Sequence, residues 1–268
     1  MDLINKRLRK VGNMVNQTDP IPVKGFFQVG IDLGTANIVL IVVDETGEPL
    51  AAFMEWAEVV RDGIVLDYWG ATQIVKKLQS KAEQRIGRKI EQAITSFPPG
   101  TDPMISENVI KNVGLKVQHV IDEPSSVIKL LNIDSGMVVD IGGGTTGIAM
   151  IRDGSIRKAY DEPTGGRHVT LTLSGNQKIS FDEAEKRKTG PDAAQYKPVV
   201  EPVFQKMADI IRQQIDGQTD LDIYLSGGAC CFPGFDEVLR REIARHRVIK
   251  PFNPLYLTPL AIASYGGV

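Results

Sequence analysis

The sequence predicts an α/β fold built from two related lobes, and two observations lead to that prediction. Apolar, β-branched segments of strand length alternate along the chain with amphipathic helical segments, which is the pattern of a layered α/β protein. A strand–turn–strand unit with Asp32-Leu33-Gly34-Thr35 is followed later by a second unit of the same design, with Asp140-Ile141-Gly142-Gly143. Two hairpins of one design indicate a duplicated domain with a cleft between the copies.

Composition restricts the classes of protein to which the chain can belong. It has 268 residues, of which 42% are hydrophobic and 24% charged, and its formal net charge is -2. A nucleic-acid-binding protein needs a basic excess that this chain lacks, and no apolar run reaches the roughly 18 residues of a membrane-spanning helix. The adjacent Cys230 and Cys231 and three scattered histidines argue against a disulfide framework or a zinc site. We expect a cytoplasmic protein.

The first lobe follows a short N-terminal region. Residues 1–25 are expected to form an amphipathic helix, with Ile4, Leu8 and Val11 on one face, and then a proline-containing linker. Lobe I then spans residues 26–134. Its expected parts are the first hairpin, a small subdomain at 53–91 with a turn at Arg61-Asp62-Gly63 and a helix at 71–87, a strand at 92–100, a helix at 106–114 capped by Ser106, a strand at 116–124 and a helix at 125–132.

Lobe II is expected to span residues 135–255, with a small subdomain at 166–200, and a C-terminal helix within 256–268 is expected to complete lobe I. The expected parts of lobe II are the second hairpin at 137–156, a charged helix at 180–190, a long amphipathic helix through 201–215, a strand at 222–225, a glycine turn at 226–234 and a helix at 235–246.

The glycine run GGGTTG at 142–147 satisfies the dinucleotide fingerprint G-x-G-x-x-G only literally. That fingerprint requires the glycine turn to open a helix, whereas the residues that follow, GIAMI, predict a strand. The Gly-Lys-Ser/Thr of the Walker pattern does not occur in the sequence either. The feature to explain is therefore a strand, a glycine turn and another strand, used twice.

Two such turns can bind a polyphosphate from two sides. Glycines let backbone N–H groups approach an anion closely, and the threonines and the asparagine of the two turns add further polar groups. Asp32 and Asp140 would repel a phosphate unless a hard cation such as Mg²⁺ lay between, held directly or through water. The alternative is that the glycines and aspartates only close two tight turns.

Two further features have both a structural and a functional interpretation. In Asp122-Glu123-Pro124, the Glu123 carboxylate can simply stabilise a helix by lying at the positive, N-terminal end of its dipole. Alternatively, it can orient an attacking water. The pair Gly227-Gly228 follows a strand and precedes a helix. It can permit close packing, or it can let a flat purine or ribose lie against the backbone.

The order of these features resembles the superfamily of actin, heat-shock chaperone and sugar kinase ATPases. The order is Asp-Leu-Gly-Thr, Asp-Glu-Pro, Asp-Ile-Gly-Gly-Gly-Thr and Ser-Gly-Gly, followed by the small-residue segment PLAIASYGG. IDLGTAN at 31–37 also resembles the same stretch of the bacterial actin MreB. The resemblance implies a duplicated actin-like (ribonuclease H-like) fold, with two lobes around a nucleotide cleft, ATP or ADP as the cofactor and Mg²⁺ as the metal.

The resemblance also implies roles for individual residues. Asp32 and Asp140 would hold the metal through water and would act in catalysis together with Glu123. The heat-shock branch has an acid where this chain has Pro259-Leu260-Ala261, and its catalytic lysine has no clear counterpart, so we expect at most a slow Mg-dependent ATPase. The residues expected to bind the nucleotide are Gly34, Thr35 and Asn37 in the first phosphate loop, Gly142, Gly143, Gly144 and Thr145 in the second, Glu185 and Lys188 near the purine, and Gly227 and Gly228 in the adenosine loop.

A closer resemblance covers nearly the full chain. WAEVVRDGIVLDYWGA, TSFPPGTDP, VVDIGGGTTGIA and TPLAIAS resemble the EutJ family of ethanolamine-utilisation proteins, which is encoded with ethanolamine ammonia-lyase and bacterial microcompartment genes. That resemblance implies an ATP-binding, chaperone-like protein whose nucleotide-driven lobe closure acts on ethanolamine catabolic enzymes or on microcompartment shell proteins. It implies a cytoplasmic location, associated with a microcompartment.

Other functions stay open at this level. The superfamily also includes actin-like filament proteins, small-molecule kinases and reactivating factors for cobalamin-dependent lyases, which here would be ethanolamine ammonia-lyase. The kinases usually carry large substrate-domain insertions, for which 268 residues leave little room. The N-terminal helix can either pack on its own lobe or direct the protein to a microcompartment.

Overall fold

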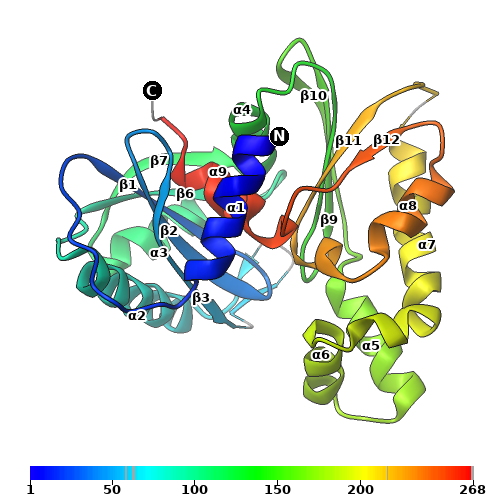
Figure 1. Cartoon of the computed structure of the whole chain (residues 1–268), viewed down its shortest axis with the longest axis horizontal. Helices are drawn as coiled ribbons and strands as arrows, with labels where there is room; N and C mark the ends of the chain where they lie inside the picture. Colours follow the sequence, from blue (N-terminus) through cyan, green and yellow to red (C-terminus); the bar gives the residue numbers. More distant parts are fainter. Residues whose placement is uncertain (58, 62–63, 216, 267–268) are drawn as a thin grey trace. The chain divides into compact units, whose positions relative to one another are not determined.

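The computed structural model describes residues 1–57, 59–61, 64–215 and 217–266, and the chain divides into two compact units (Figure 1). Unit 1 consists of residues 1–132 together with the segment that begins at Tyr256, and unit 2 consists of residues 133–255. The chain therefore leaves unit 1 once and returns to it at the end. The turn expected at 61–63 includes Asp62 and Gly63, which lie outside the described residues.

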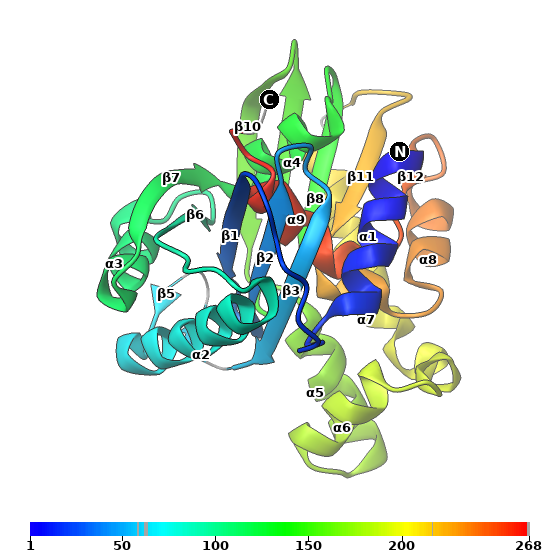
Figure 2. The same ribbon diagram turned by 60° about the vertical axis from the view of Figure 1, so that its left-hand side comes forward.

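Unit 1 contains a five-stranded sheet in the order β3-β2-β1-β6-β7 (Figure 2). The strands β1, β2 and β3 are antiparallel, whereas β6 and β7 run parallel to β1. Residues 38–43 are all buried, which fits their unbroken run of β-branched and aliphatic side chains. The strands are β1 Phe27–Leu33, β2 Asn37–Asp44, β3 Pro49–Trp56, β6 Gln92–Phe97 and β7 Lys116–Asp122; a separate small sheet pairs β4 Val60–Arg61 with β5 Ile64–Val65.

Helices cover both faces of this sheet. The helices α2 (Tyr68–Ile86) and α3 (Pro103–Val113) share a core with the side chains of Ile31 and Leu33 from β1. Side chains alternate along a strand, so Gly30 faces the opposite way, and there it meets α9 (Leu257–Ala263). The helices α1 (Asp2–Met14) and α4 (Glu123–Leu131) complete this second layer, α1 against β3 and α4 against α9.

The N-terminal helix packs on its own unit. Its buried side chains are Ile4, Leu8, Val11 and Met14. After the helix the chain follows β3, because the side-chain amide of Asn16 donates to Met54 O and accepts from Met54 N, both at 3.1 Å. The segment expected to be a linker then lies along α2, where Ile21 N donates to Arg85 O at 2.7 Å and Arg85 Nη1 donates to the carbonyls of residues 17 and 19.

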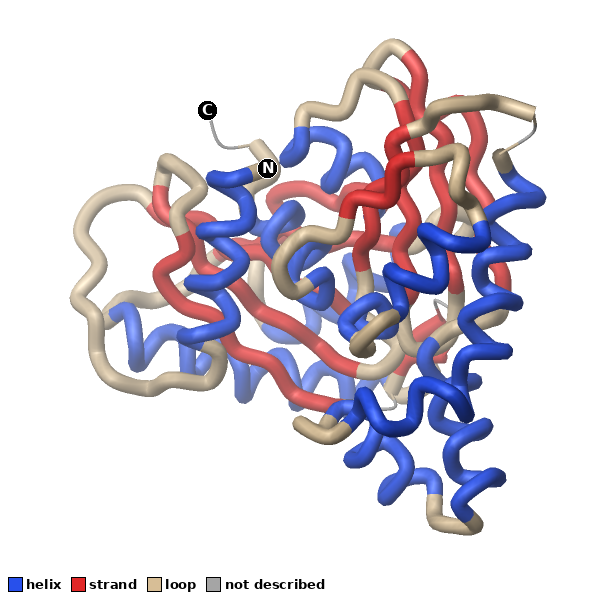
Figure 3. The backbone as a smooth tube through the Cα atoms, turned by 45° about the vertical axis from the view of Figure 1, so that its right-hand side comes forward, coloured by secondary structure: helices blue, strands red, loops and turns tan. Residues whose placement is uncertain are grey.

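Unit 2 contains a second five-stranded sheet, in the order β10-β9-β8-β11-β12. Figure 3 draws the strands in red and the helices in blue. The helices of unit 2 share a core in which the Phe204 ring packs edge-on against Phe232 and Phe235, with centroids 5.1 and 5.0 Å away. None of the helices in the described part of the chain is long and apolar enough to cross a membrane. The elements are β8 Gly136–Ile141, β9 Thr146–Arg152, β10 Ser155–Glu162, α5 Gly166–Gln177, α6 Phe181–Thr189, α7 Lys197–Gln214, β11 Asp222–Ser226, α8 Phe235–Glu242 and β12 Arg247–Ile249, with short 3-10 helices at Ala193–Tyr196, Gly228–Cys231 and Pro254–Tyr256.

The two sheets repeat one topology. In each unit the first three strands are antiparallel and the next two run parallel to the first, in the same spatial order. Asp32 and Asp140 both occupy the penultimate position of the first strand of their unit. The predicted duplicated α/β fold is confirmed.

Four helices begin earlier than the sequence analysis expected: α2 at Tyr68, α7 at Lys197, α3 and α4. The helix α3 begins at Pro103, not at 106, because the side chain of Asp102 accepts from Met104 N at 2.9 Å, and Ser106 is buried inside the helix. The helix α4 begins at Glu123 because Asp122 accepts from Ser125 N at 2.9 Å. In both cases an aspartate cap is followed by a proline in the first turn, a combination that starts a helix readily.

Candidate functional site

The first hairpin holds Asp32 and a short glycine turn at one end of β1. Asp32 pairs with Val39 across the hairpin, so the turn consists of residues 34–36 and β2 begins at Asn37. A Cβ on Gly34 would lie 3.0 Å from the carbonyl oxygen of Asn37, which explains why a glycine stands there. The turn residues and Asn37 are partly exposed, so a ligand can contact their polar groups.

Glu123 lies at the same edge of the same sheet. The strand β6 runs parallel to β1, with Ile31 paired to Thr95, whose hydroxyl donates to Ile31 O at 2.9 Å. The strand β7 runs parallel to β6 and ends immediately before Glu123. Because the carboxyl ends of neighbouring parallel strands meet at one edge, Asp32 and Glu123 share that edge. Unit 1 thus gathers the first phosphate-loop residues and Glu123.

Sequence analysis missed Ser96 at this edge. It is paired with Ile121 on β7 and only 2% exposed, and its Oγ has no hydrogen-bond partner among the described residues. Buried hydroxyl groups normally have one, so Ser96 is a further candidate for a polar contact with a ligand. The available signal was a serine in a buried strand, directly before Phe97 and a Pro-Pro-Gly stop.

The second hairpin has a longer glycine turn whose conformation is fixed by α5. Gly142 N donates to Thr145 O at 3.0 Å within the turn. The first amides of α5 bind two of its carbonyls, Gly166 N to Gly142 O at 2.9 Å and Arg167 N to Gly143 O at 2.8 Å. The approach requires glycine at 165, where a Cβ would lie 2.8 Å from the same carbonyl oxygens. The glycine turn predicted to be the second phosphate loop is therefore held in one conformation by its hydrogen bonds to α5.

Gly227 lies directly against Asp140. The strand β11 runs parallel to β8, with Ser226 paired to Asp140. A Cβ on Gly227 would lie 2.5 Å from Asp140 Oδ1 and 2.3 Å from Ile141 O, and the residue has φ +91°, so only glycine fits. The structure thus brings the expected adenosine loop into contact with the expected metal-associated aspartate.

Glu185 and Lys188 form an ion pair that joins α6 to the start of α5. Lys188 Nζ lies 2.7 Å from Glu185 Oε2 and donates to Thr170 Oγ1 at 2.9 Å and to Gly166 O at 3.2 Å. Burial lowers the pKa of Lys188, and the Glu185 carboxylate opposes that shift. Since Gly166 N is bound to Gly142 O, a continuous series of contacts runs from this pair to the glycine turn.

The expected site residues therefore form two groups, one in each unit. No cluster of three or more His, Cys, Asp or Glu side chains that could hold a metal ion occurs among the described residues. Asp32 and Asp140 are the hard oxygen donors that Mg²⁺ prefers, and water usually completes its shell, so the residues suit the predicted ion. Unit 1 carries Asp32, Gly34, Thr35, Asn37 and Glu123; unit 2 carries Asp140, Gly142, Gly143, Gly144, Thr145, Glu185, Lys188, Gly227 and Gly228.

The models of two protein families each match part of the chain. The family model for the cell division protein FtsA matches residues 137–261, and that for the MreB/Mbl protein matches residues 53–178. The MreB5 structure of Spiroplasma citri bound to AMPPNP shares the fold, with a TM-score of 0.71 at 16% identity over 89% of this chain and 95% of that chain.

Two relatives match over almost their whole length. The ethanolamine utilization protein EutJ of Escherichia coli (strain K12) is 48% identical over 263 residues, which cover 98% of this chain and 94% of that protein. The crystal structure of EutJ from Carboxydothermus hydrogenoformans has a TM-score of 0.94 at 41% identity and covers 99% of both chains. Hence the chain belongs to the EutJ family of ethanolamine utilization proteins.

Proposed function

We propose that this protein binds ATP or ADP with Mg²⁺ and acts as a chaperone-like protein in ethanolamine utilisation, with the nucleotide driving closure of its two units. The observation that carries the proposal is the repeated hairpin, in which a penultimate aspartate precedes a glycine turn in each unit. Two such turns, each with a carboxylate beside it, suit a polyphosphate that carries a divalent cation. The AMPPNP bound by MreB5, which shares the fold, supports this choice of ligand.

Each unit contributes its own set of groups in this proposal. The first glycine turn and the second bind the phosphates, Asp32 and Asp140 hold Mg²⁺ through water, and Glu123 orients the attacking water. The Glu185–Lys188 pair and Gly227-Gly228 lie beside the purine and ribose. The segment Pro259-Leu260-Ala261 is buried in α9, which supports nucleotide binding with slow hydrolysis, because no acid stands there.

Nucleotide binding is tested by calorimetry of the purified protein with Mg-ATP and Mg-ADP. Asp140→Asn keeps the shape of the side chain and removes its charge, so we expect about tenfold weaker binding in Mg²⁺ and a smaller loss in EDTA. The matched control is Asp153→Asn in the exposed β9–β10 turn, which should bind as the unchanged protein does. Absence of Mg-ATP binding to the pure protein would refute the proposal.

The clients are tested by pull-down from cells grown on ethanolamine, with ATP and with ADP. We expect ethanolamine catabolic enzymes or microcompartment shell proteins to be retained differently in the two nucleotide states, because only a ligand with differential affinity shifts a conformational equilibrium. Pelleting that depends on ATP would instead indicate an actin-like filament. Recovery of inactivated ethanolamine ammonia-lyase on addition of the protein and ATP would indicate a reactivating factor.

A further inference from the structure

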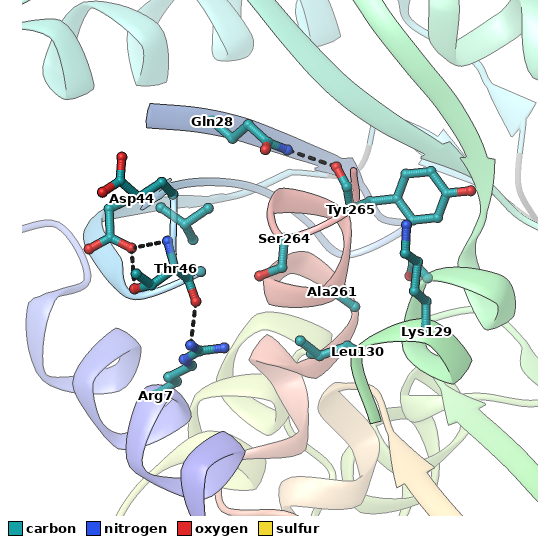
Figure 4. Close-up of a pocket in the computed structure, with 13 residues that line it drawn as sticks. Arg7, Gln28, Asp44, Thr46, Lys129, Leu130, Ala261, Ser264 and Tyr265 are labelled. Carbon is teal, nitrogen blue, oxygen red and sulfur yellow. Dashed lines mark hydrogen bonds between the residues drawn. The ribbon is translucent and has the colours of Figure 1, made fainter. Parts of the chain in front are cut away.

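Unit 1 contains a cavity of about 280 Å³ that none of the proposed nucleotide-binding residues lines (Figure 4). Gln28 lines it near the start of β1, whereas Asp32 lies near the end of that strand. The other walls come from α1, the end of β2 with the turn after it, α4, and α9 with the residues after it. The cavity is therefore built by five segments at the edge of the sheet opposite to Asp32 and Glu123.

The framework of the cavity is held in place by buried contacts. The side chain of Gln28 is buried, with a relative exposure of 4%, and donates to the carbonyl oxygen of Tyr265 at 2.7 Å. The Tyr265 ring contacts Lys129, whose Nζ is 4.4 Å from the ring centroid, and the His119 ring, which is nearly perpendicular to it with centroids 5.7 Å apart. These contacts fix the aromatic ring and the ammonium group on one side of the cavity.

Arg7 and Ser264 supply hydrogen-bond donors on the other side. The Arg7 side chain is only 13% exposed, and its Nη2 donates to Thr46 O. A Cβ on Gly47 would lie 3.1 Å from Arg7 Nη1 and 3.5 Å from Ser264 Oγ, so the guanidinium and the hydroxyl converge on one point of the wall. The buried Ser264 Oγ has no hydrogen-bond partner among the described residues.

Two of the three acidic groups around the cavity already have partners. Asp44 Oδ1 accepts from Thr46 N at 2.8 Å, from Thr46 Oγ1 at 2.6 Å and from Glu48 N at 3.0 Å. Glu48 is bound by Lys10 at 2.7 Å and lies 3.6 Å from Arg7 Nε. Glu45 is exposed at the rim. Lys129, in contrast, forms no ion pair within the described part of the chain, so its positive charge is available to attract a negatively charged guest.

We propose that this cavity binds a small organic anion, a carboxylate or a phosphate monoester. Its charged group accepts hydrogen bonds from Arg7 and Ser264, because charge-assisted hydrogen bonds to a guanidinium are the strongest that this site offers. The ammonium of Lys129, on the other side of the cavity, adds a weaker electrostatic attraction. Its short apolar part contacts Leu130 and Ala261. The volume is at the small end of ligand pockets, which restricts the guest to the size of a simple metabolite.

This binding is independent of the proposed nucleotide site but shares elements with it. The strand β1 carries Gln28 in the cavity and Asp32 at the other edge, and α4 carries Lys129 in the cavity and Glu123 at its first position. Because no residue belongs to both sites, the anion is expected to bind whether or not ATP does, and the two tests can fail separately.

The test is calorimetry of the full chain with acetate, butyrate, inorganic phosphate and methyl phosphate at constant ionic strength, with and without saturating Mg-ADP. We expect one site per chain that ADP does not block, and the preferred probe decides between carboxylate and phosphate. Arg7→Gln should weaken binding about tenfold, and Lys129→Gln, whose ammonium acts from the other side of the cavity, about threefold. Lys6→Gln, an exposed lysine one position away on α1, is the matched control and should leave the affinity unchanged.

Four results would overturn the proposal: no binding of any probe, an affinity of the Arg7 and Lys129 variants equal to that of the unsubstituted protein, a weakening in the Lys6 control as large as in the Arg7 variant, or loss of binding when ADP is present. Lys129 is exposed, so we expect Lys129→Gln to keep the fold, and this variant decides the matter even if Arg7→Gln disturbs the packing of α1. Glycerol, which is neutral and of similar size, should give no heat of binding.

Discussion

Gly30 of β1 and Ala263 of α9 approach so closely that no side chain fits between them: a Cβ on Gly30 would lie 2.4 Å from Ala263 N and 2.5 Å from its Cα. Backbone atoms cannot move aside as a flexible side chain can. We therefore expect Gly30→Ala to lower the free energy of unfolding by about 1–3 kcal/mol, measured by urea denaturation. Gly175→Ala in α5, where a new methyl group meets nothing within 4 Å, should instead raise it by about 0.5–1 kcal/mol. Equal stability of the two variants would contradict the close contact.

The N-terminal helix is expected to stabilise unit 1 through its buried face. Leu8 is fully buried, whereas Leu3 on the same helix is 56% exposed. Leu8→Ala should cost about 2–4 kcal/mol of unfolding free energy because it leaves a cavity under the helix, and Leu3→Ala should change it by less than about 0.5 kcal/mol. Similar small effects of both substitutions would mean that the helix is not held on the sheet.

The buried ammonium of Lys188 is expected to stabilise the contact between α5 and α6. Lys188→Met keeps most of the volume but leaves Glu185 and Thr170 without their shared donor, so we expect a loss of about 2 kcal/mol in thermal or urea unfolding. If the proposed nucleotide site is right, Mg-ATP affinity should fall as well. Lys186→Met, an exposed lysine of the same helical turn, should leave both quantities unchanged.

The pair formed by Asp222 and Arg247 predicts a specific pH dependence. Arg247 Nε donates to Asp222 Oδ1 at 2.7 Å across neighbouring strands, and this hydrogen bond lowers the pKa of Asp222 while burial opposes the shift. A lowered carboxyl pKa contributes stability that is fully present above the unfolded value near 3.8 and is lost as the pH falls through the lower folded value. Asp222→Asn should reduce the urea midpoint at neutral pH and have no effect at the acidic end of the titration.

The control for that titration is Asp192→Asn, an exposed aspartate whose side chain makes no capping hydrogen bond. It should leave the urea midpoint unchanged at every pH. Since Arg247 is largely exposed, the effect of Asp222→Asn should also shrink in high salt. A midpoint that falls equally at neutral and acidic pH would mean that the charge of Asp222 contributes nothing.

The parts of the fold that could be predicted from the sequence are those with a strong local pattern. Each of the two hairpins combines apolar strands with an Asp and a glycine turn. This local pattern predicts the strands, and its repetition predicts the duplication. The strand β10 gave no such pattern, because in the segment 155–162 most side chains are exposed, and the expected hairpin ended at 156. Asp102 and Asp122 are both visible in the sequence as possible caps, but the sequence analysis expected Ser106 to cap the first of these helices and the strand before the second to continue to residue 124.

Contacts between distant segments explain the rest of what the sequence did not reveal. Nothing near Gly227 indicates that Asp140 lies against it, since the contact depends on the pairing of β8 with β11. The cavity in unit 1 combines Arg7, Gln28, Lys129 and Ser264, which no local motif connects. Such sites are defined by tertiary packing, and periodicity along a single segment carries no information about them.

The return of the chain to unit 1 has a consequence for biosynthesis. The strand β1 is made early, but the helix that covers it, α9, is translated only after all of unit 2. Unit 2 is a continuous segment and can fold as it leaves the ribosome, whereas the face of β1 around Gly30 stays uncovered until the last helix emerges. Unit 1 is therefore the later of the two to be completed during synthesis, although its first strands are made before any part of unit 2.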